Sequence, residues 1–204
     1  MIKTMPKQII IILVFLLIIG GIFYYLSQRS EEKETSELEL KTPESEEVEK
    51  TSPEGKTQNM KIESPAFAGN ESIPSKYTCD GKDVNPPLKF SEIPGDSESL
   101  ILIVDDPDAP GGTWVHWTIW NIAPETKEIG EASVPEGAVE GITDFGEPGY
   151  GGPCPPSGTH RYFFKLFALD TTLDLDSSAK KKDIEKAMEG HVLDRAQLIG
   201  LYSR

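Results

Sequence analysis

The residues best suited to chemistry lie in two stretches rich in proline and glycine. Residues 104–117, VDDPDAPGGTWVHW, crowd three carboxylates and two prolines into one turn and then place His116 between two tryptophans. Because proline fixes φ near about −65° and removes a backbone donor, this turn should hold its carboxylates rigidly. An acidic residue at such a turn often closes an Asx turn, and we assign that structural role to Asp105 or Asp108.

The second stretch, residues 144–160, holds five glycines and four prolines in DFGEPGYGGPCPPSGTH. Glycine lets the backbone come close to a ligand, and proline limits the entropy that is lost on binding. Exposed N–H groups between glycines can also form a nest for an anion. The alternative, which the sequence leaves open, is a long tight turn that binds nothing.

Two apolar segments, 114–122 and 160–169, are the elements that would position the histidines. Side chains alternate between the two faces of a strand, so His160 and Tyr162 share a face. In the strand 114–122, the same alternation predicts one face composed of Trp114, His116, Thr118 and Trp120. If both strands belong to one sheet, His116, His160 and Tyr162 meet at one rim, above an apolar floor.

The rest of the domain is composed of short apolar segments between turns. The predicted strands are 61–63, 76–78, 87–90, 99–104, 114–122, 160–169 and 196–203. An amphipathic pattern predicts a helix at 179–189, with Gly190 as its C-terminal cap. Many short strands with frequent turns predict a mainly β fold, an antiparallel sandwich of Greek-key type with one or two short helices.

The chain has 204 residues and a formal net charge of −14, and its N-terminal part differs from the rest. Residues 9–26 are uncharged and would span about 27 Å as a helix, close to the thickness of a bilayer core. They lack the cleavage site of a secretory signal. We therefore expect residues 1–30 to be a transmembrane anchor, with the N-terminus cytoplasmic and the domain outside, since Lys3 and Lys7 precede the apolar run.

Residues 31–59 hold ten glutamates, four lysines and no aromatic residue, which predicts a disordered tether. The folded domain should then occupy residues 60–204. It is acidic and has no basic stripe, so nucleic acid is a poor partner. Its two cysteines, Cys79 and Cys154, can form a disulfide in an extracytoplasmic domain or remain as buried thiols, and the sequence leaves both open.

Three motifs in one order give a resemblance over residues 60–204. VDDPDAP, the following VHW, and GPCPPSGTHRYFFKLFALD resemble the phosphatidylethanolamine-binding proteins, also called Raf kinase inhibitor proteins, and most of all their prokaryotic branch. The resemblance implies a β-sandwich with a small anion-binding pocket at one end. The pocket residues that it implies are Asp106, His116, His160 and Tyr162, with Gly152 and Pro153 at the rim.

We therefore expect a binding domain with no catalytic residues, metal or cofactor. Its ligand would be a small anion of phosphate type, held with His116 or His160 in the protonated form. Two other functions stay open: a module that inhibits a protease or contacts a signalling partner such as a kinase, and a metal-dependent enzyme that uses Asp106, His116 and His160. His191 lacks such neighbours and is interpreted as structural.

Overall fold

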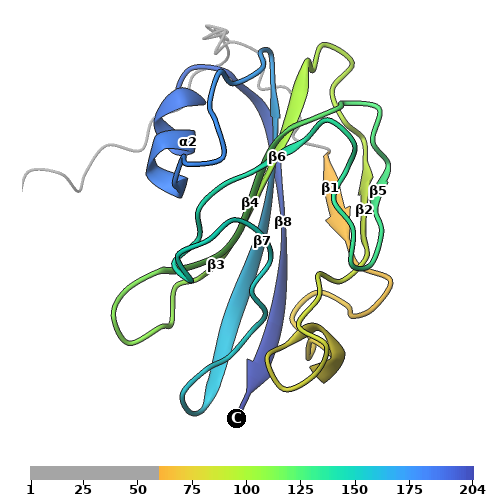
Figure 1. The fold of residues 1–204 in the computed structure, drawn as a ribbon. Coiled ribbons are helices and arrows are strands. Elements are labelled where there is room, and N and C mark those ends of the chain that lie inside the picture. The colour runs from red at the N-terminus through yellow and green to blue at the C-terminus, as the bar shows by residue number, and fades with distance from the viewer. Residues whose placement is uncertain (1–59) are drawn as a thin grey trace, which may run out of the picture. The chain divides into compact units, whose positions relative to one another are not determined.

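The computed structural model describes residues 60–204, which form two antiparallel β-sheets and one short α-helix (Figure 1). The smaller sheet has the strand order β1-β2-β5, and the larger has the order β6-β4-β3-β7-β8. The elements are β1 (Lys61–Glu63), the 3-10 helix η1 (Ser75–Tyr77), β2 (Leu88–Ser91), β3 (Ser99–Asp106), β4 (Trp114–Ile122), β5 (Glu128–Ile129), β6 (Val139–Glu140), β7 (Thr159–Leu169), α2 (Lys181–Ala187) and β8 (Val192–Ser203). The prediction of a mainly β fold with antiparallel sheets is confirmed.

The predicted anchor at 9–26, with the remainder of 1–30, and the tether at 31–59 lie outside the described residues. Within residues 60–204, no helix is long and apolar enough to cross a membrane. The membrane anchor and the domain boundary at residue 60 therefore stay predictions.

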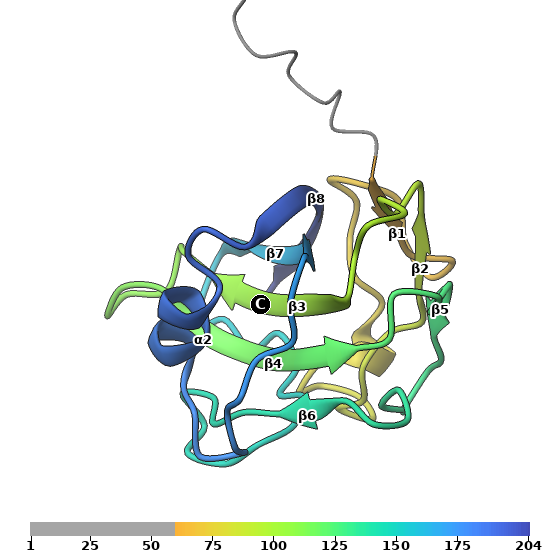
Figure 2. The ribbon, with the colours of Figure 1, turned by 90° about the horizontal axis from the view of Figure 1, so that it is seen from above.

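Strand β3 is the centre of the domain, and all eight of its residues are buried. Leu102 and Val104 belong to the core that the two sheets share, whereas Ile101 and Ile103 pack with residues of α2 on the opposite face. Figure 2 shows α2 and the smaller sheet on opposite sides of the larger one. Each such buried side chain contributes about 1.5–3 kcal/mol of hydrophobic free energy, so this uninterrupted apolar run needs a cover on both faces.

A buried carboxylate fastens α2 to the sheet. Asp105 is fully buried on the α2 side of β3. Lys165 of β7 places its Nζ 2.7 Å from Oδ1 and 2.8 Å from Oδ2 of this carboxylate. Lys181 of α2 places its Nζ 2.7 Å from Oδ2. Two cations thus compensate one buried anion and join three elements.

Several predicted elements differ from those observed. The segment 76–78, predicted as a strand, lies instead at the end of η1, where Tyr77 N–H donates to Pro74 O and Thr78 N–H to Ser75 O. These local bonds satisfy the backbone without a partner strand. Strand β8 begins at Val192 rather than at residue 196, because it pairs with β7 along nearly its whole length. The two-residue strands β5 and β6 were not predicted, since so short a pairing leaves no periodic pattern.

The helix predicted at 179–189 is shorter, Lys181–Ala187. The Asp183 carboxylate accepts a hydrogen bond of 3.0 Å from the backbone N–H of Lys180, which satisfies a donor at the start of the helix. Beyond the helix, Gly190 has φ +81°. That conformation favours glycine, but the predicted C-terminal cap was wrong, because the helix is capped two residues earlier by Met188, whose N–H donates to Ile184 O at 3.0 Å.

Replacing Asp105 by Ala should destabilise the domain, because it leaves two lysines without their shared anion. Breaking a fully buried pair costs roughly 3–5 kcal/mol, and since both lysines are partly exposed we expect a loss of about 2–4 kcal/mol. Urea unfolding followed by circular dichroism measures it. The control is Asp170→Ala, which removes an exposed carboxylate that pairs with His191. A loss at Asp105 no larger than at Asp170 would contradict this account of the buried cluster.

Candidate functional site

An irregularity in β4 decides which side chains face the candidate site. Asp105 of β3 pairs with Val115 of β4, but the preceding residue Val104 pairs with Trp117. His116 is therefore one extra residue on β4, which is the definition of a β-bulge. The regular alternation of faces is interrupted at this residue.

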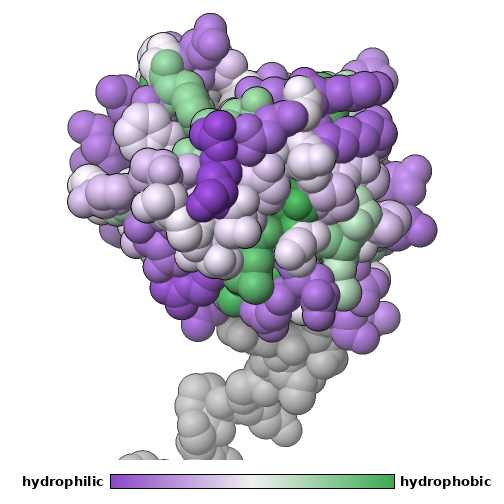
Figure 3. Space-filling view, turned by 90° about the horizontal axis from the view of Figure 1, so that it is seen from below, coloured by the Kyte–Doolittle hydropathy of each residue, from purple (hydrophilic) through white to green (hydrophobic). Residues whose placement is uncertain are grey.

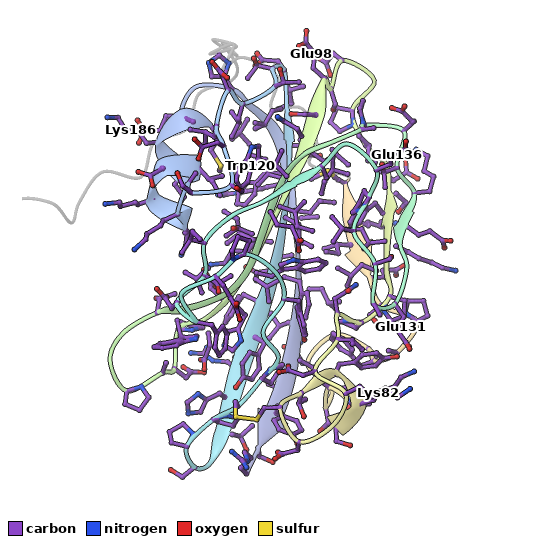
Figure 4. All side chains as sticks on the ribbon, in the orientation of Figure 1. Lys82, Glu98, Trp120, Glu131, Glu136 and Lys186 are labelled. Atoms are coloured by element: carbon purple, nitrogen blue, oxygen red, sulfur yellow. A yellow bond between two sulfur atoms is a disulfide. The ribbon has the colours of Figure 1, made fainter. Side chains whose placement is uncertain are left out.

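Because of the bulge, the alternation predicted for β4 is right up to His116 and wrong after it. Trp114 and His116 share a face, as predicted, and both line the same cavity. Thr118 and Trp120 do not lie with them. Trp120 packs with residues of α2 (Figure 4), and Thr118 pairs with Ile103, which belongs to the same α2-side core.

The polar centre of the site is a buried pair from neighbouring strands. Nδ1 of His160, on β7, lies 2.7 Å from Oδ2 of Asp106, on β3, and both side chains are buried. Oδ1 of Asp106 accepts a hydrogen bond of 2.8 Å from the backbone N–H of Asp108. Both carboxylate oxygens are thus engaged by donors, and the second ring nitrogen of His160, Nε2, is left for a ligand.

His116 is fixed by the glycine-rich loop. Its Nδ1 lies 2.7 Å from the carbonyl oxygen of Gly151. A carbonyl oxygen only accepts, so Nδ1 must carry a hydrogen and donate it. Burial lowers the pKa of His116, against the opposing effect of the Gly151 carbonyl and of Asp106. Burial thus favours the neutral ring, in which Nε2 is a hydrogen-bond acceptor.

The third polar group is the hydroxyl of Tyr162. Tyr162 lies on β7 two residues after His160, and its ring is 5.1 Å from that of His116. The hydroxyl is buried, and no residue among 60–204 accepts a hydrogen bond from it. Burial, reinforced by the charge of Asp106 and opposed by a hydrogen bond from the Cys154 backbone, raises the pKa of Tyr162, so the hydroxyl keeps its proton.

These groups line one cavity of about 320 Å³. The four residues predicted for the pocket centre, Asp106, His116, His160 and Tyr162, are all on its wall. The other lining residues are largely apolar: Ala109, Pro110, Trp114, Phe145, Cys154, Pro155 and Pro156. Figure 3 looks at the end of the domain to which the glycine-rich loop and the C-terminus belong. There, pale and green side chains lie among purple, hydrophilic ones.

The acidic turn is held from outside by an ion pair. Asp108 accepts hydrogen bonds of 2.8 Å from Nε and 2.6 Å from an Nη of Arg161, and 3.0 Å from its backbone N–H. These bonds lower the pKa of Asp108 to about 2. The predicted assignment of the Asx turn was wrong, because Asp106 closes it through the Asp108 N–H, while Asp105 belongs to the lysine cluster.

Gly152 and Pro153, predicted at the rim, lie next to the cavity without lining it. The N–H of Gly152 donates 2.7 Å to Asp83, and a Cβ there would come within 2.6 Å of the same carboxylate. The carbonyl of Pro153 accepts from Cys79 N–H at 3.2 Å. The prediction is corrected accordingly: these two residues anchor the loop, because their backbone faces the segment behind it.

The loop is also anchored by a covalent bond. Cys79 and Cys154 form a disulfide with a Cα–Cα distance of 5.5 Å. In Figure 4 the sulfur–sulfur bond lies toward the end of the domain that carries Lys82, far from Glu98. Of the two cysteines, only Cys154 lines the cavity.

Two aromatic wall residues were not singled out from the sequence. Trp114 and Phe145 are among the most exposed large apolar side chains of residues 60–204, and their ring centroids lie 5.6 Å apart. Phe145 also contacts the ring of His116 at 5.4 Å. Trp114 could have been found from its alternation with His116, whereas Phe145 is placed by tertiary folding of the loop alone.

The arrangement does not fit a metal centre. Among residues 60–204, no group of three or more His, Cys, Asp or Glu side chains is placed to hold a metal ion. Oδ2 of Asp106 and Nδ1 of His160 are hydrogen-bonded to each other, and Nδ1 of His116 is hydrogen-bonded to the Gly151 carbonyl. What the site offers is hydrogen bonding to a small polar group between apolar walls.

Comparison with known proteins gives one consistent family. The sequence model of the family described as "Phosphatidylethanolamine-binding protein" matches residues 63–203. A UPF0098 protein of Methanothermobacter thermautotrophicus is 53% identical over 150 residues, covering 71% of this chain and 99% of that protein. One from Pyrococcus horikoshii is 51% identical over 154 residues, covering 72% of this chain and 77% of that protein.

Two solved structures share the fold. The crystal structure of a putative phosphatidylethanolamine-binding protein homologue from Chlamydia trachomatis has a TM-score of 0.70 and 39% identity, covering 72% of this chain and 99% of that one. E. coli YbcL, described as a member of the mammalian PEBP family, has a TM-score of 0.68 and 30% identity, covering 71% and 98%.

The ion pair at the acidic turn gives a direct test of the geometry. Replacing Arg161 by Gln removes the charged donors, so the pKa of Asp108 should rise from about 2 toward its ordinary value of about 3.9. Carboxyl ¹³C NMR titration measures the pKa. The control is Arg195→Gln, which removes an exposed arginine of β8. An unchanged pKa in the Arg161 variant would mean that the ion pair is absent in solution.

Proposed function

The chain belongs to the phosphatidylethanolamine-binding protein family, and we propose that its domain binds phosphate-type anionic ligands without catalysing a reaction. Such a ligand would occupy the cavity of about 320 Å³. His160 and Tyr162 would donate hydrogen bonds to its oxygens, and Asp106 would orient His160. No nucleophile paired with a general base lines this cavity, and its polar groups are instead suited to holding a ligand.

The observation that carries the proposal is the buried hydroxyl of Tyr162, whose proton has no acceptor among residues 60–204. A buried donor without an acceptor costs about 1–3 kcal/mol, so proteins rarely keep one unless it serves a purpose. This hydroxyl is on the wall of a cavity that also contains two histidines. An oxyanion in the cavity would provide the missing acceptor, and binding would then recover the cost.

We further propose that residues 9–26 anchor the protein in a membrane, with the binding domain outside. The support is the uncharged run of eighteen residues and the two lysines that precede it. The acidic domain should be repelled by anionic lipid, so the anchor rather than the domain surface would hold the protein at the membrane. The ligand would then be one that is present on the extracytoplasmic side.

Replacing Tyr162 by Phe should weaken the binding of inorganic phosphate by about tenfold, because one hydrogen bond to a charged ligand is lost. The same change should alter the stability of the ligand-free protein little, since the proton of the hydroxyl has no acceptor there. Calorimetric titration of the full-length chain and thermal melting measure the two effects. The control is Tyr202→Phe, which removes a hydroxyl that bonds to Asp80 and does not line the cavity. Absence of phosphate binding to the unaltered protein would overturn the proposal.

A further inference from the structure

The charge of the cavity limits which anion it can accept. None of its lining residues is a lysine or an arginine. Two guanidiniums lie near its wall, and each is paired with a carboxylate outside it: Arg161 with Asp108, and Arg204, whose Nη1 is 3.5 Å from Sγ of Cys154, with Asp80. The group placed to compensate the charge of Asp106 is His160, whose Nδ1 lies 2.7 Å from the carboxylate. A doubly charged ligand would therefore add two negative charges to a site that has no positive charge to spare.

The tautomer of His116 adds a second requirement. Because Nδ1 donates to the Gly151 carbonyl at 2.7 Å, Nε2 of the neutral ring is a hydrogen-bond acceptor. An acceptor facing a fully ionised anion would repel it. The same nitrogen is satisfied if the ligand presents a hydroxyl, and so the cavity combines donors with one acceptor.

The groups around the two histidines add no positive charge to the cavity. His116 is flanked on β3 by the charges of Asp105 and Asp106, and on β7 by the ring of Tyr162, which stays protonated. The charge of Asp105 is matched by its two lysines on the far face of the sheet. Among residues 60–204, the charges that act on His116 are those of Asp105 and Asp106 alone.

His160 has an equally simple surrounding. It contacts Asp106 directly, and the Asp108–Arg161 pair lies beyond. Since Nδ1 of His160 is used on the Asp106 carboxylate, Nε2 is the ring atom from which His160 can donate to a ligand when both nitrogens carry hydrogen. The two histidines thus have opposite roles: His160 donates and His116 accepts.

On this basis, which rests on the proposed function, we propose that the cavity selects the singly charged, still protonated form of a phosphate monoester with an apolar substituent. His160 and Tyr162 donate to two of its oxygens, and its P–OH donates to Nε2 of His116. The substituent lies against Trp114 and Phe145. These two rings are 40% and 46% exposed, which leaves apolar surface at the mouth of the cavity for a ligand to cover.

Phenyl phosphate and phenyl sulfate test this requirement, because they have nearly the same shape. The phosphate loses its second proton at a pKa of about 6, whereas the sulfate is a monoanion without a hydroxyl at any pH used. At pH 5 the full-length chain should bind phenyl phosphate about tenfold more tightly, the value of one good hydrogen bond to a buried acceptor. At pH 8 only about one phosphate molecule in a hundred keeps the proton, so this preference should disappear.

The ratio of the two affinities isolates the effect of the ligand's own proton, because a change in the protein that weakens the binding of both anions alike leaves the ratio unchanged. Calorimetric titration at pH 5 and pH 8 gives the four affinities. A ratio that is constant with pH, or that rises toward pH 8, overturns the selection of the monoanion and leaves anion binding intact. If neither compound binds, the proposed function itself is wrong.

His116→Asn provides the matched variant. The side-chain amide of Asn can donate to the Gly151 carbonyl as Nδ1 does, but it has no atom at the position of Nε2. At pH 5 the ratio of affinities should fall from about tenfold to near one, whereas Tyr202→Phe should keep it. Thermal melting confirms that each variant is folded. An unchanged ratio in a folded Asn variant would show that His116 does not accept a hydrogen bond from the P–OH of the ligand.

A lipid and a free metabolite could both present this chemistry. A water-soluble, short-chain phosphatidic acid carries the same phosphate monoester on a diacylglycerol. Binding of phenyl phosphate but not of this lipid, with the same pH dependence, would identify a small-molecule ligand and support the assignment. Binding of both would identify the monoester itself as the recognised group, which also supports it.

Discussion

The burial of two consecutive carboxylates on the central strand is the constraint on which the domain depends. Asp105 and Asp106 end β3 and point to opposite faces of the sheet, and both are buried. A buried charge is costly unless it is paired, so each face must bring its own cations. Lys165 and Lys181 do this on the α2 side, and His160 does it on the other.

The two compensations have different consequences. Lysines remain charged, so the cluster around Asp105 is a permanent fastening between the sheet and α2. On the other face, a single histidine pairs with Asp106 through Nδ1, and both residues line the cavity. The same strand end therefore fastens α2 on one face and forms the polar centre of the cavity on the other. The bulge at His116 places the second histidine on the wall of the same cavity. Beyond the bulge, Thr118 and Trp120 lie on the α2 side of the sheet.

Much of the site could be predicted from local rules and the family resemblance. Strict alternation in β7 put His160 and Tyr162 on one face, and the structure has them so. In β4 the same rule failed beyond His116, since one extra residue shifts the faces and pairing with β3 decides where it is accommodated. The segment 76–78, Lys-Tyr-Thr, was mistaken for a strand because so short a segment has no periodic pattern that separates a strand from a 3-10 turn. Rim residues Gly152 and Pro153 were assigned to the cavity because a glycine-rich loop gives no signal for which of its faces is inward.

The sequence by itself determined the mainly β architecture, the buried β3 and the residue types that can recognise an anion, because these follow from periodicity and from the chemistry of each side chain. Only the tertiary structure decided which groups meet. The assignment of Asp106 to the turn, the pairing of Cys79 with Cys154, the burial of the Tyr162 hydroxyl without an acceptor among residues 60–204 and the arrival of Phe145 beside His116 all depend on contacts between distant segments. Such contacts are fixed by packing and by strand register, neither of which is written in any short stretch of the chain.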